Sequence, residues 1–490
     1  QNIIIGQGTN AAALTGNTNT IIGDSAGQAM TSAANNVAVG ANTLVAHTTA
    51  ANGTAVGANA LQSNTTGADN TGLGKGALAS NTTAAQNTAV GVRSMEDTTT
   101  GADNTAIGWG SLTENTTGTN NVALGRSSLS SNTSASNNVA AGLLALGTNT
   151  TGAVNTALGH QALEKNTTAG NNVAVGGNSL NKNTVGAGNT AVGANALKAN
   201  TTASNNTAVG QGAMFTNTTG TVNTAIGLNT LYANTTASSN TALGAEALTS
   251  NTTGANNTGL GRNALRVTTT GSHNTAIGKD AGLAVTTGGN NVLIGAIAGQ
   301  EITNGQFNIC LGPTEAGDNL VSGGFNMYIG YLTRASGSNV SDEMVIGCGN
   351  RVHLGKGTNT GFISPDTGGV FQGNNSASWA QTSDQRLKKN IVNSTIGLAE
   401  INQLQIRNFE YRSVDEITEI ADKNVIDIEG VQVGVIAQEI QAILPNCVNE
   451  ESTGVLSVNS DNLTWHMIKA IQELSAQNAA LTARITTLEG

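Results

Sequence analysis

Residues 70–86 read NTGLGKGALASNTTAAQ, and a unit of the same pattern begins again at Asn87. The glycine that ends the short apolar run of each unit recurs every 17 residues from Gly6 to Gly312, and then at Gly330 and Gly347. A unit this short cannot bury a core of its own and must stack on its neighbours. The period therefore predicts a rod of stacked coils over most of the chain.

Each unit is expected to form one coil of a mainly β structure, a parallel β-solenoid or β-roll. The run Thr88-Ala89-Val90 has the length and residue types of a strand, and Gly91 and the Asn-Thr-Thr triplets supply corners. A solenoid of paired helices is disfavoured, because its units have about 33 residues or more and are rich in Leu, Glu and Lys.

Two sets of equivalent positions define the predicted interior. The asparagine at which one unit closes and the next begins recurs from Asn70 to Asn308, and we call this set the closing ladder. It predicts side-chain amides stacked coil upon coil. A leucine ladder runs from Leu44 to Leu265, with Met95 among its members. Because the apolar interior of so narrow a coil is thin, lateral burial against identical chains is the natural way to stabilise it.

The composition excludes several classes of protein. Of 490 residues, 63 are glycine and only 10% are charged, which is typical of a biased repeat. Acidic residues outnumber basic ones 30 to 20 without a basic cluster, so nucleic-acid binding is not expected. The cysteines Cys310, Cys348 and Cys447 lack the paired spacing of a metal site or disulfide framework. We expect all three to be small apolar residues, and we predict no metal and no cofactor.

The domain organisation follows from a change in composition. We expect a shaft of repeats over residues 1–347, a connector over 348–382 and a small α+β domain over 383–490, which holds nearly half of the charged residues. The chain opens inside a repeat at Gln1, so an upstream virion or cell anchor is expected. A final helix over about 460–490 carries a heptad seam that predicts a coiled coil: Met467, Ile471, Leu474, Asn478, Leu481, Ile485 and Leu488.

The stretch from Ser383 to Ile391, SDQRLKKNI, resembles the start of the C-terminal intramolecular chaperone of phage tail spikes and fibres, the endosialidase type. The aromatic run 409–411, the segment 434–445 and the helix that carries residues 463–474 agree with that family in order. The resemblance implies a homotrimeric folding clamp that removes itself. Its serine and lysine correspond to Ser383 and Lys388, and cleavage would fall between Thr382 and Ser383.

The implied self-cleavage is chemically reasonable. A serine that follows the scissile bond can attack the carbonyl of Thr382 if a nearby lysine accepts its proton. Removal of Lys388 from water on assembly would favour its neutral form, so cleavage would wait for folding. Lys389 and Arg386 are alternatives as proton acceptor. The structural alternative is that Ser383 caps a turn and Lys388 is a solvated charge.

The repeats themselves resemble the stacked-coil heads of trimeric adhesins and phage fibre shafts. Together the two resemblances imply a homotrimeric virion tail fibre that attaches to a cell-surface receptor, expected to be a glycan, with self-cleavage as its only enzymatic activity. A bacterial surface or predatory-cell adhesin with the same chaperone is the first alternative. A glycan-degrading tail spike would need paired carboxylates, which are scattered here, and an ice-binding coil is a third alternative.

Three aromatic residues are candidate receptor contacts: Trp109, Phe215 and Tyr232. Variable positions follow the glycine and precede the Asn-Thr-Thr triplet, and they are expected to point outward. Phe215 and Tyr232 share one repeat position on adjacent coils and would form an aromatic shelf for a sugar, or else cover a trimer seam. The Asn-Thr-Thr triplets are interpreted as corner residues rather than glycosylation acceptors.

Overall fold

The computed structural model describes residues 1–9, 14–365, 369–372, 380–381, 385–413, 416–417, 429–450 and 455–490. The chain divides into two compact units, Gln1–Thr382 and Ser383–Gly490.

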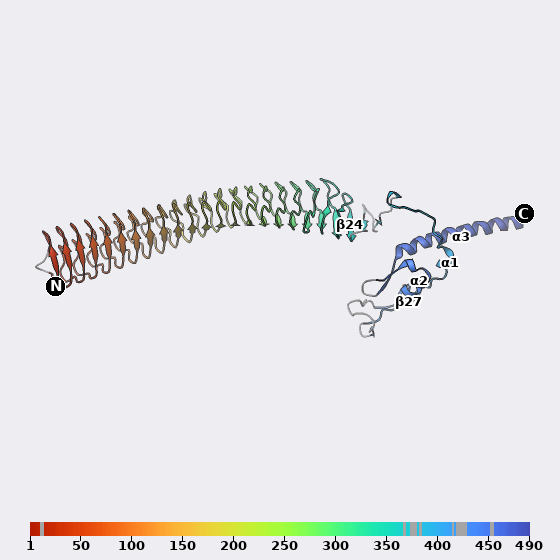
Figure 1. The fold of residues 1–490 in the computed structure, drawn as a ribbon, viewed down its shortest axis with the longest axis horizontal. Helices are drawn as coiled ribbons and strands as arrows, with labels where there is room; N and C mark the ends of the chain where they lie inside the picture. The colour runs from red at the N-terminus through yellow and green to blue at the C-terminus, as the bar shows by residue number, and fades with distance from the viewer. Residues whose placement is uncertain are drawn as a thin grey trace. The chain divides into compact units, whose positions relative to one another are not determined.

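The first unit is a parallel β-solenoid, as the period predicted (Figure 1). Each coil contributes one short strand that pairs in parallel with the strands of the coils before and after it. The pairing is in register at the 17-residue spacing, for example Thr88 with Thr105 and Ala89 with Ala106. The strands of the regular coils are β1 (Ile3–Ile5), β2 (Thr20–Ile22), β3 (Val37–Val39), β4 (Thr54–Val56), β5 (Thr71–Leu73), β6 (Thr88–Val90), β7 (Thr105–Ile107), β8 (Val122–Leu124), β9 (Val139–Ala141), β10 (Thr156–Leu158), β11 (Val173–Val175), β12 (Thr190–Val192), β13 (Thr207–Val209), β14 (Thr224–Ile226), β15 (Thr241–Leu243), β16 (Thr258–Leu260), β17 (Thr275–Ile277), β18 (Val292–Ile294), β19 (Ile309–Leu311) and β20 (Met327–Ile329).

The parallel ladder continues beyond Gly347. Strand β22 (Met344–Cys348) pairs in parallel with β24 (Gly361–Pro365), and two antiparallel strands, β25 (Val370–Gln372) and β26 (Ala380–Gln381), follow. A second small parallel pair joins β21 (Thr333–Arg334) to β23 (His353–Leu354). The coils therefore extend further along the chain than the glycine ladder alone indicates.

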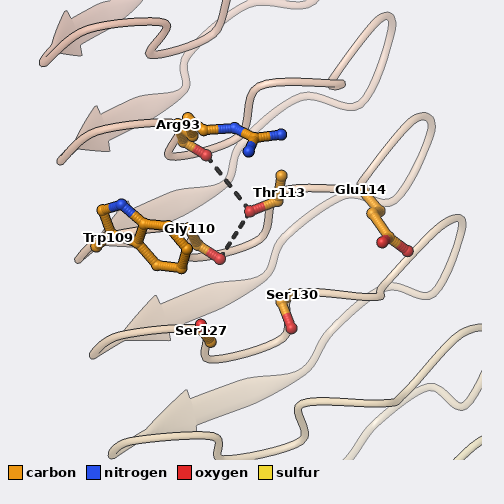
Figure 2. A pocket seen from close by; sticks show the side chains of 7 residues that line it. All are labelled: Arg93, Trp109, Gly110, Thr113, Glu114, Ser127 and Ser130. Atoms are coloured by element: carbon orange, nitrogen blue, oxygen red, sulfur yellow. Dashed lines mark hydrogen bonds between the residues drawn. The ribbon is translucent and has the colours of Figure 1, made fainter.

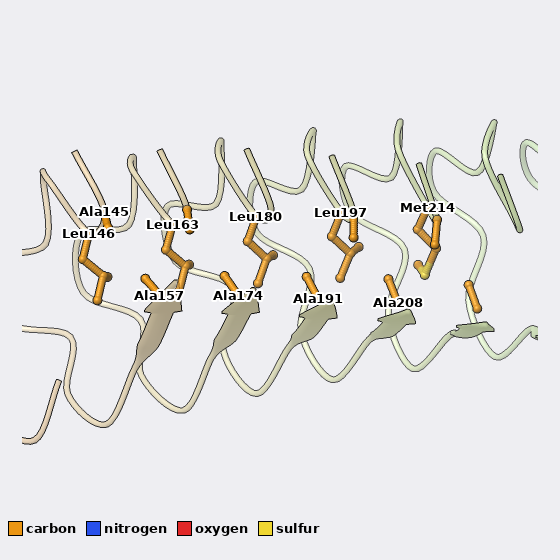
Figure 3. Packing of buried hydrophobic residues seen from close by; sticks show 14 of the residues in the cluster. Ala145, Leu146, Ala157, Leu163, Ala174, Leu180, Ala191, Leu197, Ala208 and Met214 are labelled. Atoms are coloured by element: carbon orange, nitrogen blue, oxygen red, sulfur yellow. The ribbon is translucent and has the colours of Figure 1, made fainter. Parts of the chain in front are cut away.

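The interior of the solenoid is narrow and aliphatic. The middle residue of each strand points inward, and Ala157, Ala174 and Ala191 are fully buried against the leucines of neighbouring coils (Figure 3). The predicted leucine ladder is buried along its whole length, from Leu44 to Leu265. The first and third residues of each strand lie on the outer side, which follows from the two-residue period of a strand.

Buried asparagines satisfy the backbone inside the coils. In the closing ladder, the backbone N–H of Asn104 donates to Oδ1 of Asn87 at 2.9 Å, and Nδ2 of Asn104 donates to the carbonyl of Gly118 at 2.9 Å. The predicted amide stacking is confirmed. The triplet asparagines form a second buried ladder, in which Nδ2 of Asn132 donates to Oδ1 of Asn115 at 2.9 Å. These amides are buried corner groups inside the folded shaft.

The second unit has the predicted α+β composition. Its elements are η1 (Gln385–Leu387), α1 (Leu398–Ile401), β27 (Arg407–Phe409), β28 (Gln432–Gly434), α2 (Ala437–Ile443), η4 (Pro445–Cys447), β29 (Val448–Glu450), β30 (Leu456–Val458) and α3 (Ser460–Glu489). β27 pairs antiparallel with β28, and β29 with β30. Its core is small: Ile440, Leu444 and Cys447 are buried, with Leu463 of α3 packed against them.

The helix α3 begins at a side-chain cap, because Oδ1 of Asn459 accepts a hydrogen bond from the backbone N–H of Asn462 at 3.1 Å. It runs for 30 residues, as the heptad pattern predicted. Among the described residues, no helix combines the length and apolarity needed to cross a bilayer.

The three cysteines differ in environment. Cys310 and Cys447 are buried and reduced, as expected for small apolar residues, and burial raises the pKa of the Cys310 thiol to about 12. The prediction is wrong for Cys348, which is exposed at the end of β22, where the strand alternation turns its side chain outward.

Candidate functional site

The segment predicted to carry self-cleavage is only partly described. Thr382 and Ser383 lie outside the described residues. Lys388 follows η1 directly, its backbone N–H donates to the carbonyl of Gln385 at 3.1 Å, and its side chain is exposed. The alternatives Arg386 and Lys389 are exposed as well. The Ser383–Lys388 pair and the bond it would cut remain predictions.

The chain around Lys388 exposes apolar side chains. All residues from 385 to 395 are exposed, and this segment includes Leu387, Ile391 and Val392, the last at 85% exposure. Three large aliphatic side chains in one exposed segment are unfavourable in water. The segment is therefore an exposed apolar stretch of the single chain.

Two polar contacts hold the elements of this unit together. Glu473 of α3 accepts a hydrogen bond from the backbone N–H of Leu398, at the start of α1, at 2.9 Å, and Nζ of Lys469 lies 3.3 Å from its carboxylate. These contacts lower the pKa of Glu473, the bond from Leu398 most strongly. Arg407 of β27 binds both carboxylate oxygens of Glu439 on α2, at 2.8 and 3.1 Å.

The predicted heptad seam of α3 is exposed. Leu474 is 47% exposed and Ile471 66%, and the remaining apolar members are exposed too: Met467, Leu481, Ile485 and Leu488. Only Ala470 of this helix is buried. A regular apolar stripe on a helix of this length is what a coiled coil buries against a partner helix.

The described residues thus form a parallel β-solenoid and a small α+β unit that ends in a helix with an exposed apolar seam. Residues 383–449 match the family described as the chaperone of endosialidase. The match begins at the predicted start of the domain and ends within β29, before α3. The chain thus carries an endosialidase-type chaperone segment after its β-solenoid.

The first predicted receptor contact, Trp109, borders a hollow on the shaft. The ring is 50% exposed, and the guanidinium carbon of Arg126 lies 5.3 Å from its centre. Thr113 and Gly110 both line this hollow, and Oγ1 of Thr113 donates to the carbonyl of Gly110 at 2.7 Å, a bond drawn in Figure 2. The hollow measures about 150 Å³ and is lined by Arg93, Trp109, Gly110, Thr113, Glu114, Ser127 and Ser130.

The other two predicted contacts are stacked on each other. The ring centres of Phe215 and Tyr232 lie 5.0 Å apart with planes 5° apart, and Nζ of Lys198 lies 5.5 Å from the centre of the Phe215 ring. The shared repeat position predicted this adjacency. Both faces of Phe215 thus have neighbours within the shaft, which leaves less open ring surface for a sugar than a free shelf would offer. Whether either residue binds a receptor stays a prediction.

A second aromatic pair of the shaft is absent from the sequence-based candidates. Phe307 and Phe325 stack with centres 4.8 Å apart, and Phe325 is 63% exposed. They are 18 residues apart, because the coil between them has one extra residue, so a search at the 17-residue period misses them. Each directly precedes a ladder asparagine, Asn308 or Asn326, and that shared neighbour is the signal that could have found them.

A buried carboxylate ends the closing asparagine ladder. Glu343 takes the position after Asn326, and its backbone N–H donates to Oδ1 of Asn326 at 2.9 Å. Its own carboxylate accepts hydrogen bonds from the hydroxyl of Tyr328 at 2.9 Å and the backbone N–H of Gly357 at 2.7 Å. Since these bonds satisfy the buried polar oxygens of the side chain, we assign Glu343 a structural role.

Proposed function

We propose that this protein is a homotrimeric fibre whose C-terminal domain aligns three parallel chains and then cleaves itself off between Thr382 and Ser383. The exposed seam of α3, directly after a segment that matches an endosialidase chaperone, is the observation that carries this proposal. A monomeric domain would leave that seam and the apolar segment around Lys388 in water.

The repeat explains why such a fibre needs an aligning domain. Chains that pair through a 17-residue repeat find a nearly equivalent arrangement at every slip of one coil. A domain that associates in only one way fixes the ends of the three chains and excludes slipped registers. Three parallel chains also bury the seam of each α3 in one coiled coil.

The mature fibre is proposed to attach a virion to a glycan on the surface of its host cell. Support comes from the variable outward positions of the shaft, above all the hollow beside Trp109, where an aromatic ring lies near charged and hydroxyl side chains. Antibody against the shaft, imaged on particles and on cells of the source organism, separates a tail fibre from a cell-surface adhesin. Label on virion fibres supports the proposal, and label on whole cells alone contradicts it.

Self-cleavage is tested by comparing the wild-type chain with a Ser383→Ala variant on a denaturing gel. The wild type should give two bands and the variant only the full-length chain. Ser394→Ala is the matched control, because Ser394 is exposed in the same unit and outside the proposed dyad. Normal cleavage in Ser383→Ala would reject the assignment.

The proton acceptor is tested with Lys388→Ala, Lys389→Ala and Arg386→Ala, each compared at equal trimer content by light scattering. Loss of cleavage in the trimeric Lys388→Ala variant alone supports Lys388 as the base. Loss in one of the other two instead would move the role to that residue.

A further inference from the structure

The outer side of the strands forms a continuous surface without charge. Its members are the first and third residues of each strand, which we call the strand face. Among the described strands β1 to β20 and β22, none contains a charged residue. The third position is aliphatic in every coil: Ile5, Ile22, Val39, Val56, Leu73, Val90, Ile107, Leu124, Ala141, Leu158, Val175, Val192, Val209, Ile226, Leu243, Leu260, Ile277, Ile294, Leu311, Ile329 and Ile346.

The strand face is accessible in the single chain. Leu73, Ile107 and Leu243 are each between 44% and 48% exposed, although inward residues of the same strands, such as Ala106 and Ala242, are fully buried. Exposed apolar patches on soluble monomers rarely exceed a few hundred Å². The aliphatic third position repeats in every coil from β1 to β20 and in β22, so the half-exposed to exposed apolar stripe runs along the whole shaft, beside first positions that are often threonine.

The area of the strand face is large enough for a stable interface. A strand of three residues is about 10 Å long and successive coils rise about 4.8 Å, so each coil offers roughly 50 Å². The strands β1 to β20 and β22 together offer on the order of 1,000 Å². A specific interface buries about 800 Å² on each partner.

The regular spacing of the strand face fits a second copy of this chain. Both copies rise by the same amount per coil, about 4.8 Å, so coil can face coil along the whole shaft. The other sides of the coil carry the charged variable residues, among them Arg126 and Glu114. We infer that the strand face packs against the strand faces of parallel copies of this chain.

This inference rests on the proposed trimer and adds to it the side of the shaft that is buried. The Asn-Thr-Thr corners and the hollow beside Trp109 would then remain outside. Contacts along the whole shaft would hold the fibre together after the chaperone has left. The shaft itself would thus supply the lasting interface, and the chaperone would only set the register in which the chains pair.

Cross-linking of the full chain tests the assignment. Val192→Cys lies on the strand face. Val185→Cys is the matched control, because Val185 takes the third position of a corner triplet and is 51% exposed. Both variants also carry Cys348→Ser, because Cys348 is exposed and would react with the cross-linker, whereas Cys310 and Cys447 are buried. A short bis-maleimide should join chains through Val192→Cys and leave Val185→Cys uncrosslinked. Cross-linking of the control alone would overturn the assignment while leaving the fibre proposal intact.

Charge substitution tests whether the face supplies binding energy. A triple Val175→Asp, Val192→Asp, Val209→Asp variant places three carboxylates on the strand face, and Val154→Asp, Val185→Asp, Val222→Asp places three on exposed positions elsewhere. The first variant should raise the concentration at which the oligomer dissociates roughly 100-fold or more, because buried unpaired charges are strongly unfavourable.

Sedimentation and circular dichroism provide the measurements. A folded but dissociated strand-face variant beside an oligomeric control supports the inference. Equal dissociation in both variants, or in neither, overturns it. A monomeric wild-type chain would overturn the trimer proposal as well, which separates the two failures.

Discussion

At Gly159 the backbone φ is +139°, and an added Cβ would lie 2.6 Å from the carbonyl oxygen of Gly176 in the next coil. That oxygen belongs to the stacked backbone, so no change of rotamer can relieve the clash. The same arrangement recurs along the shaft. Steric exclusion between coils therefore explains why the 17-residue glycine ladder is so strict.

We expect Gly159→Ala to destabilise its coils by about 2 kcal/mol or more, since it combines a backbone clash with an unfavourable φ. Gly177→Ala is the control, because a Cβ there meets no atom within 4 Å, and its effect should stay within about 0.5 kcal/mol. Hydrogen exchange reports the local change in a long repeat, where global unfolding is not two-state. Equal protection in the two variants would contradict this explanation.

His47 takes a position in the triplet ladder that is asparagine in most coils, from Asn64 to Asn251. Its Nε2 lies 2.9 Å from the carbonyl of Ala50, and Nδ2 of Asn64 lies 2.8 Å from its Nδ1. Since the amide nitrogen donates, Nδ1 must accept and Nε2 must carry the proton, so the ring is neutral. Burial is the main cause that lowers the pKa of His47.

A lowered folded-state pKa means that the unfolded chain binds the proton more tightly. The stabilisation by neutral His47 is complete above the unfolded pKa, about 6.5, and is lost as the pH falls through the folded value. We expect the coils near His47 to exchange amide hydrogens faster at pH 5 than at pH 7 after correction for intrinsic rates. His47→Asn should remove this difference, and His160→Asn, at an exposed site, should not. A pH effect unchanged by His47→Asn would refute this origin.

The sequence predicted which residues are buried in the interior better than it predicted their backbone conformation. Repetition identifies Leu163 as a core residue, and it is fully buried. Its φ of +52° is left-handed, a conformation that local propensity assigns to glycine or asparagine rather than leucine. Burial in the stacked coil stabilises a conformation that an isolated segment would avoid, so no local pattern could predict it.

At the scale of elements, the strands were predictable wherever the glycine marker persists. Strand β24 was not, because Ser364 pairs with Gly347 and takes the place of the expected glycine. In the second unit, the sequence motif identified the domain but not the contacts between its elements. The hydrogen bonds from Arg407 to Glu439 and from Leu398 to Glu473 join residues far apart in sequence. Such pairs follow from tertiary packing and carry no local signal.

The seam of α3 gives a prediction for this element. Ile471→Asp should place a charge at the centre of the proposed coiled coil, so we expect loss of trimer and of self-cleavage together. Ala476→Asp is the control, because Ala476 is exposed on the same helix and outside the seam. Light scattering measures the mass and a denaturing gel the cleavage. Trimeric, cleaved Ile471→Asp protein would show that the seam is not needed.

At the scale of the whole molecule, the single chain exposes two apolar surfaces of different period. The strand face repeats every 17 residues and permits many registers, whereas the α3 seam belongs to a unit that occurs once. Association through the second surface can therefore specify a register that the first surface then stabilises. The composition of the shaft predicted lateral burial, but only the structure identifies which side of each coil is free of charge.

If the chaperone sets the register and the shaft supplies the lasting contacts, the cleaved shaft and the uncleaved trimer should differ in how well they refold. Non-local strand pairing is slow, and a cleaved shaft has lost the domain that sets its register, so its chains should refold from guanidinium into slipped or aggregated forms. The uncleaved Ser383→Ala trimer retains the domain and should recover its trimeric mass. Before unfolding, both should resist dissociation equally, because the shaft contacts are the same and the barrier to separating them is high. Light scattering after matched refolding measures the difference, and full recovery of the cleaved shaft would show that its coils find their register unaided.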